Sequence, residues 1–245
     1  MNADIVKLTL RQLAGRRRTA FMVLVALLPA ALAVAFRAGG EAGPAEWTST
    51  RLLGGMVVTM LLPLASLVFG TAILGSEVED GTAVYLLARP IPRREILLSK
   101  LGVAWLLTAA YVVPSAAIGG AIAFQGAEGW GPMLAGFVVA ILAGSLAYCT
   151  VFAFLSLLTG RAFIAGLLYV FIWEGLVTGL FAGTRLLSIR HAALGLAGFV
   201  GDASPDVFDP DLGGPTAVFI LALATAVAGW LAVRKLQRFE IGESG

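Results

Sequence analysis

The chain has 245 residues, of which 59% are apolar and 13% are charged, and its mean hydropathy is +0.91. A soluble domain is about 45–50% apolar and about 25% charged, so a chain of this length cannot hide so much apolar surface from water. A net charge of +2, with the basic residues set between apolar runs, also excludes a disordered tail and a nucleic-acid binder. We therefore expect the chain to lie in the lipid bilayer. We also expect it to have no nucleic-acid partner.

Six apolar stretches are long enough to cross a bilayer as helices, which takes about 20 mostly apolar residues. They cover residues 19–36, 52–75, 101–124, 132–158, 162–182 and 214–233. Each stretch is too long, and alternates too little, to be a barrel strand. The predicted fold class is all-α: a polytopic membrane protein whose six transmembrane helices form a single domain over residues 1–245.

Basic residues are unequally divided between the connections on the two sides of the predicted bundle. Thirteen of the 17 lysines and arginines fall on one side and four on the other. The positive-inside rule places the richer side in the cytoplasm. We therefore predict that both termini and the 76–100 connection are cytoplasmic, and that residues 37–51, 125–131 and 183–213 lie outside.

Two segments beyond the spans carry apolar faces of their own. Residues 1–18 place Ile5 and Leu8 at helical spacing with basic residues nearby, which predicts an amphipathic helix on the cytoplasmic face. A cleaved signal peptide is the alternative, but the apolar run of about 18 residues that follows exceeds the usual core of such a peptide. Residues 186–200 are mostly apolar but too short to span, which favours a re-entrant or interfacial segment before the last span.

The sequence carries no nucleotide-binding or catalytic motif. It lacks G-x-x-x-x-G-K-[ST], which cradles nucleotide phosphates, and H-E-x-x-H, which binds zinc. An intramembrane protease would need a nucleophile paired with a histidine, but the single His191 lies in the outer connection and no G-x-S-G occurs. We therefore predict no catalytic residue and no metal site, and we interpret His191 as a polar residue at the interface.

The 76–100 connection holds the densest set of polar residues. Its acids come first and its bases last, and Pro90 and Pro92 break its middle. The run from Arg93 to Glu95 is expected to open a helix that continues into the third span. The alternatives are a solvated loop beside anionic lipid headgroups and a carboxylate cluster that binds a divalent metal.

The motifs of this connection are those of a known family. The strings E-x-E-x-G-T and L-L-x-R-P-I-P-R-x-E-x-L-x-x-K, between a second and a third span, resemble the permeases of ABC type-2 transporters. The basic N-terminal helix, the six spans and the long outer connection fit the same family. The pair Trp173-Glu174 in the fifth span resembles a bacterial branch near the permeases for multi-copper enzyme maturation.

The resemblance implies a permease of the bacterial cytoplasmic (inner) membrane that exports its substrate. It would pair with a second copy or a related permease, and with two separate ATPase subunits that hold the ATP and Mg²⁺, while this chain binds no cofactor. The 76–100 connection resembles the coupling helix that docks on the ATPase. The coupling residues implied are Glu77, Glu79, Asp80, Gly81, Thr82, Arg89, Arg93, Arg94 and Glu95. A membrane anchor or sensor subunit, and a channel or secondary carrier, are the other functions considered.

Glu174 is the one acid well inside a predicted span, where it follows Trp173. A charge at membrane depth is costly and usually faces a partner or a wet cavity. Glu174 is therefore expected to line a substrate path, to bind a cation, or to lock the helices by hydrogen bonding while it is protonated.

Small residues recur at four-residue spacing on two spans, which lets helices approach closely. Residues 136, 140 and 144 form such a ridge on the fourth span, and the fifth span carries Gly175, Gly179 and Gly183. We predict that the second ridge is a seam between two permease copies, with packing inside one chain as the alternative.

Overall fold

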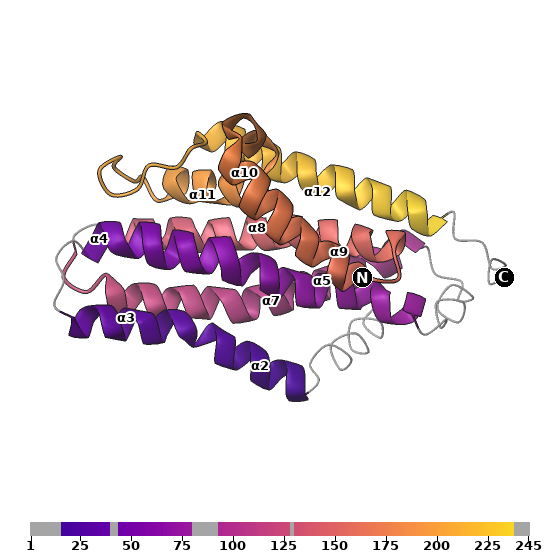
Figure 1. The fold of residues 1–245 in the computed structure, drawn as a ribbon, viewed down its shortest axis with the longest axis horizontal. Helices are drawn as coiled ribbons and strands as arrows, with labels where there is room; N and C mark the ends of the chain where they lie inside the picture. The colour runs from indigo at the N-terminus through magenta and orange to yellow at the C-terminus, as the bar shows by residue number, and fades with distance from the viewer. Residues whose placement is uncertain (1–15, 40–43, 80–92, 128–129, 238–245) are drawn as a thin grey trace.

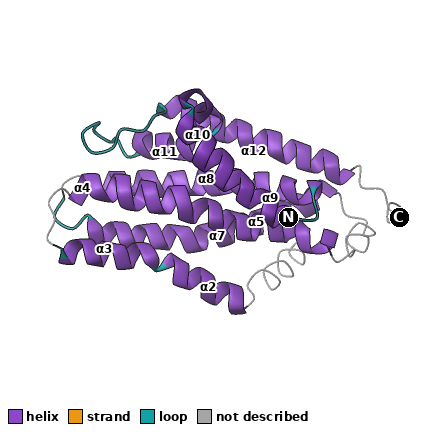
Figure 2. Cartoon of the chain, viewed as in Figure 1, coloured by secondary structure: helices purple, strands orange, loops and turns teal. Residues whose placement is uncertain are grey.

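The computed structural model describes residues 16–39, 44–79, 93–127 and 130–237, and all regular structure within these ranges is helical (Figure 2). In chain order the elements are α2 (Arg16–Ala26), α3 (Leu28–Ala38), α4 (Pro44–Trp47), the π-helix η1 (Thr48–Leu61), α5 (Leu62–Glu79), α7 (Arg93–Ala123), α8 (Trp130–Leu158), α9 (Ala162–Leu168), the π-helix η2 (Tyr169–Val177), α10 (Thr178–Leu180), the 3-10 helix η3 (Ala182–Leu187), α11 (Ile189–Val200) and α12 (Gly214–Gln237).

Six continuous helical stretches are long and apolar enough to span a membrane, which confirms the all-α polytopic prediction. They are Thr19–Ala38, Pro44–Ile73, Arg94–Ala123, Trp130–Leu158, Ala162–Leu180 and Gly214–Gln237. The second span begins at Pro44 rather than at residue 52. Proline suits a first helical position, and Trp47 then stacks on Phe36 of α3 with ring centroids 3.9 Å apart.

The spans run side by side, and successive spans alternate in direction (Figure 1). The start of α2, the end of α5, the start of α7 and the end of α12 lie at one end of the bundle, which we call the α5/α7 end. α4 and α11 lie toward the opposite end, which we call the α11 end. The predicted amphipathic helix over 1–18 lies outside the described residues except for Arg16–Arg18, which open α2.

Helix α8 is the centre of the bundle and packs against α5, α7, α11 and α12. Its Phe137, Tyr148 and Phe152 are fully buried. The most apolar windows of the second, third and fourth spans are 67%, 50% and 56% buried, against 22% for each of the other three spans. The peripheral spans therefore present apolar side chains, such as Phe171 and Leu180, that lipid or another protein must cover.

The connection between the fifth and sixth spans folds back onto the bundle. The extended backbone of Phe181 ends the fifth span, and η3 then leads into α11, which lies against α8 and α12. Glycines permit this close packing: a Cβ at Gly136 would lie 2.4 Å from the Ala197 oxygen, and one at Gly195 would lie 2.5 Å from the Leu212 oxygen. The apolar segment predicted over 186–200 is thus a 12-residue helix in contact with two spans.

Candidate functional site: a polar network beside a pocket between two spans

Glu174 lies in η2, the π-helical part of the fifth span, and is 2% exposed. Its Oε1 atom accepts hydrogen bonds from the Tyr169 hydroxyl at 3.1 Å and from the Ile189 backbone N–H at 3.0 Å. Its Oε2 atom is hydrogen-bonded to the Ser188 hydroxyl. The buried carboxyl group therefore has three partners, as a polar group in an apolar interior requires.

Two of these partners belong to the first turn of α11, whose N-terminal N–H groups lack partners within the helix. Ser188 is the N-cap, and its hydroxyl oxygen accepts the His191 backbone N–H at 3.2 Å. Glu174 accepts the Ile189 N–H, and a carboxyl group at a helix N-terminus is favoured by the helix dipole. A side chain of the fifth span thus completes the cap of α11.

Further hydrogen bonds join the end of the fifth span to the same region. Arg190 Nη2 donates to Thr178 Oγ1 at 3.0 Å, and that hydroxyl donates to the Glu174 backbone oxygen at 2.7 Å. Trp173 Nε1 donates to the Leu187 oxygen at 3.3 Å. The fifth span, η3 and α11 are therefore held together as one unit.

His191 extends the network to the surface. Its Nδ1 lies 2.9 Å from Ser188 Oγ, and its Nε2 lies 3.4 Å from Asp211 Oδ2. Asp211 also forms an ion pair with Arg185 of η3. Burial lowers the pKa of His191 to about 4, and the charges of Arg190 and Arg185 act in the same direction against that of Asp211. The imidazole is therefore neutral near pH 7.

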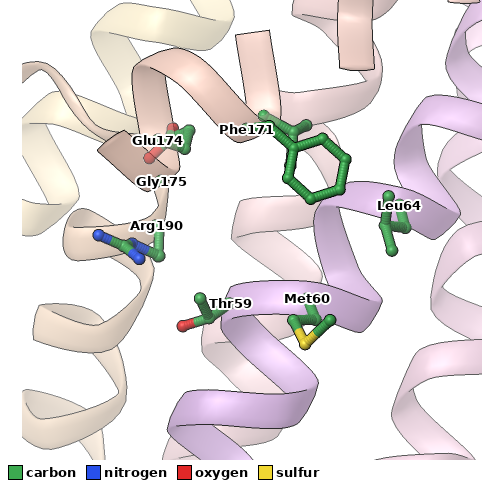
Figure 3. Close-up of a pocket in the computed structure, with 8 residues that line it drawn as sticks. Thr59, Met60, Leu64, Phe171, Glu174, Gly175 and Arg190 are labelled. Carbon is green, nitrogen blue, oxygen red and sulfur yellow. The ribbon is translucent and has the colours of Figure 1, made fainter. Parts of the chain in front are cut away.

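A pocket of about 140 Å³ opens between the second and fifth spans, next to Glu174 (Figure 3). In that view Glu174 and Arg190 lie on its α11 side, while Phe171 and Leu64 lie on the far side. The full lining is Thr59, Met60, Leu64, Val170, Phe171, Glu174, Gly175 and Arg190. Its surface is mostly apolar, so it suits an apolar or amphipathic molecule.

Both facing walls of this pocket are π-helical, with Thr59 and Met60 on η1 and residues 170–175 on η2. π-helical turns are rare and are often found at functional sites. In η1, Thr59 Oγ1 donates to the Gly54 oxygen five residues earlier at 2.8 Å. Beside the pocket, the second and fifth spans therefore both depart from regular α-helix.

The predicted coupling segment is framed by two helices. Helix α5 runs on through Glu79, so Glu77 and Glu79 belong to its last turns rather than to a loop that starts at residue 76. Helix α7 begins at Arg93, and Arg94 and Glu95 follow in its first turn, as the sequence predicted. The other predicted coupling residues, Asp80, Gly81, Thr82 and Arg89, lie outside the described residues.

Lys100 is a residue that sequence reasoning missed. It is 2% exposed, and its Nζ donates to the Ile73 backbone oxygen at 2.8 Å, which ties α7 to α5 at the end of the predicted coupling segment. The sequence contained a signal for this residue, because Lys100 is the last residue of the L-L-x-R-P-I-P-R-x-E-x-L-x-x-K motif and lies at the edge of an apolar span. A lysine placed there needs a hydrogen-bond acceptor once it is buried.

The two ridges of small residues have different surroundings. Around Gly136 and Gly144 the space is filled by neighbours in the same chain. A Cβ at Gly179 or Gly183 would meet nothing within 4 Å, and one at Gly175 only the Val170 oxygen of its own helix. Gly183 also lies in η3, beyond the break at Phe181, which corrects the expectation that all three glycines share one helix face.

Comparison with known proteins agrees with this architecture. The model of the ABC-2 family transporter proteins matches residues 16–183, which include the first five spans and the predicted coupling segment. No curated protein matches the chain. Because the family model covers more than half of a chain whose six apolar helices suit a membrane, the chain belongs to the ABC-2 family of transporter proteins.

Proposed function

We propose that the chain is the permease subunit of an ATP-driven exporter of the bacterial cytoplasmic membrane. Family membership makes it the membrane component of a transporter rather than the ATPase. In the proposal, two copies pair, and each docks through its 76–100 segment on a separate ATPase subunit that binds ATP and Mg²⁺. Both termini and the coupling segment then face the cytoplasm, as the distribution of basic residues indicates.

The observation that carries the coupling proposal is the bond from Lys100 Nζ to the Ile73 oxygen. It joins the two helices that enter and leave the coupling segment, both of which pack against α8. A displacement applied to the segment would therefore move α5 and α7 together and reach the second and third spans. Coordinated movement of packed helices is an established way of transmitting a conformational change.

The open face of the fifth span supports the pairing of two copies. Gly179 has space beside it, and Leu176 and Leu180 are exposed around it, so this face of the chain lacks a partner within the described residues. A second copy placed there would bring two pockets between spans 2 and 5 toward a shared axis. Their apolar walls suit a lipid, a hydrophobic drug or an apolar peptide better than a sugar or an ion.

The first test is gentle affinity purification of the full chain from its native membrane, followed by mass spectrometry. We expect an ATPase with a phosphate-binding loop at about one copy per permease, and we expect it to be lost from the double variant Glu79→Lys, Asp80→Lys. Glu46→Lys is the matched control, because Glu46 is an exposed acid on α4 at the opposite end of the bundle. If the charge reversals leave the complex intact, the docking assignment is wrong.

A further inference from the structure

The last span carries an exposed row of apolar side chains, which we call the α12 stripe. It consists of Phe219, Leu223, Val227 and Trp230, which are 47–65% exposed. At about 100° per residue, these four positions lie within about 80° of one another around the helix. Another face of α12 packs on α8 and α11. The α12 stripe therefore points away from the bundle, where the acyl chains of the bilayer cover it.

The α12 stripe ends in two interacting side chains at the α5/α7 end of the bundle (Figure 1). Arg234 follows Trp230 by one helical turn, and its Cζ atom lies 3.8 Å from the centre of the Trp230 ring. A cation over the face of an indole is attracted by the electrons of the ring. The contact therefore holds the guanidinium group of Arg234 beside the apolar stripe.

The charge of Arg234 has no counter-charge in the part of the chain that the structure describes. The residue is exposed, and it forms no ion pair with a described acid. The indole covers one face of the guanidinium group, whereas the N–H groups lie in the guanidinium plane and stay free. Such a planar fork of donors binds two oxygens of one phosphate group at once. Arg234 is therefore oriented to receive an oxyanion.

The length of α12 sets the depth of this pair in the bilayer. Residues 214–233 contain no charged side chain, and as a helix they extend about 30 Å. The hydrocarbon core of a bilayer is also about 30 Å thick. Arg234 therefore reaches the level of the lipid phosphates when the start of α12 lies at the other boundary. Tryptophan is enriched at this level of membrane proteins, as Trp230 would be here.

We propose that Trp230 and Arg234 bind the phosphate group of an anionic phospholipid whose acyl chains lie along the α12 stripe. The head of such a lipid lacks an ammonium group, so no positive charge on it is repelled by Arg234 and the neighbouring Lys235. The apolar stripe favours a lipid over free phosphate, because a free anion makes no contact with it. This site depends neither on the ATPase nor on the transported substrate, and it lies on a different span from the proposed seam between copies.

Photolabelling in a bilayer locates the lipid directly. The full-length protein is placed in phosphatidylcholine nanodiscs that contain a small share of a phosphatidylglycerol analogue with a photoreactive head. After illumination, the labelled positions are mapped by mass spectrometry of a chymotryptic digest, because chymotrypsin does not cleave at arginine or lysine. We expect the label on the last two turns of α12, residues 230–237. Unlabelled phosphatidylglycerol should displace it, and inorganic phosphate should not.

Variants separate this site from a general attraction of positive charge. Arg234→Gln should lower the labelling about fivefold, which is the effect of removing one basic residue from an anionic surface. Trp230→Leu keeps the stripe apolar but removes the ring, and should lower the labelling about threefold. Arg234→Lys keeps the charge without the planar fork; it should also lower the labelling, and it replaces Arg234→Gln if that variant does not fold.

Lys235→Gln is the matched control, because Lys235 carries the same charge but points about 100° away from Arg234 around the helix. Its labelling should stay close to that of the wild type. The proposal is overturned if the wild type is not labelled on these turns, or if Arg234→Gln is labelled like the wild type. It is also overturned if Lys235→Gln loses as much label as Arg234→Gln, or if inorganic phosphate displaces the lipid analogue.

Discussion

At the scale of single residues, the Glu174 carboxyl group lies where it finds the partners that a buried polar group needs in an apolar interior. Glu174 has three donors around it, and two of them belong to the start of α11. An unpaired polar group at this depth costs several kcal/mol. The carboxyl group therefore joins the fifth span to α11, and the Ser188 hydroxyl in turn contacts the imidazole of His191.

The pH dependence of stability should follow His191. Its pKa falls from the ordinary value of 6.5 to about 4 in the folded protein, so the unfolded chain binds more protons between these two values. Stability from this group is complete above pH 6.5 and is lost as the pH falls toward 4. We expect the wild type to lose about 1–2 kcal/mol more than His191→Gln over this range.

Thermal unfolding in nanodiscs at a series of pH values measures this difference. Carboxyl groups elsewhere titrate in both proteins, so the comparison between wild type and variant isolates His191. If wild type and His191→Gln lose stability in parallel as the pH falls, His191 does not contribute this pH-dependent stability.

At the scale of helices, the second, third and fourth spans form the buried centre, while the first, fifth and sixth lie around it. A buried lysine joins α5 and α7, two of the helices that pack against α8. The bond from Lys100 to the Ile73 oxygen holds the two helices together at the end of the predicted coupling segment. Because this bond joins the two helices, we expect a displacement at the α5/α7 end to move the second and third spans together.

Lys100→Met tests this link, because methionine keeps most of the side-chain length but cannot donate to Ile73. We expect the variant to retain its ATPase partner while ATP-driven transport falls at least tenfold, which corresponds to about 1.4 kcal/mol of lost coupling. Transport and co-purification are measured on the same reconstituted complex.

Lys235→Met is the matched control, because Lys235 is exposed in the last turn of α12 at the same end of the bundle. It should leave both transport and co-purification unchanged. If Lys100→Met also transports at the wild-type rate, the bond to Ile73 is structural only.

At the scale of the whole molecule, one chain leaves apolar faces uncovered. On the fourth span, α11 and α5 already pack against the ridge of small residues, at Gly136 and Gly144. The fifth span has open space beside Gly179. Small residues on a membrane helix favour close packing, so the open face is where a second copy fits in the proposed assembly.

Gly179→Leu should reduce pairing without unfolding the chain, because its new side chain would enter open space within one copy. We expect the paired fraction in nanodiscs, measured by crosslinking, to fall at least fivefold while thermal stability stays within about 0.5 kcal/mol of wild type.

Gly136→Ala gives the opposite pattern and serves as the comparison. Its Cβ would meet the Ala197 oxygen at 2.4 Å, so the chain itself should lose about 1–3 kcal/mol of stability from overpacking. An unchanged paired fraction in Gly179→Leu would place the contact between copies elsewhere.

The sequence was sufficient for the spans because hydropathy is a local property and the bilayer requires a fixed length of apolar helix. All six spans end within four residues of their predicted positions, four of them begin within two residues, and the third continues the helix that was predicted to open at Arg93. The exception is the second span, whose first turns are anchored by the stacking of Trp47 on Phe36. Such a contact between two helices leaves no mark in the hydropathy of either.

The sequence by itself determined that this protein is a six-span membrane protein, and its motifs pointed to the transporter family that the match confirms. It also marked Glu174 as an unusual acid, because a single polar residue stands out in an apolar run. Only the tertiary structure decided what Glu174 touches, because the break at Phe181 turns the chain back and brings Ser188 to it. Partners of buried polar groups depend on the path of the backbone between them, and no local pattern of residues encodes that path.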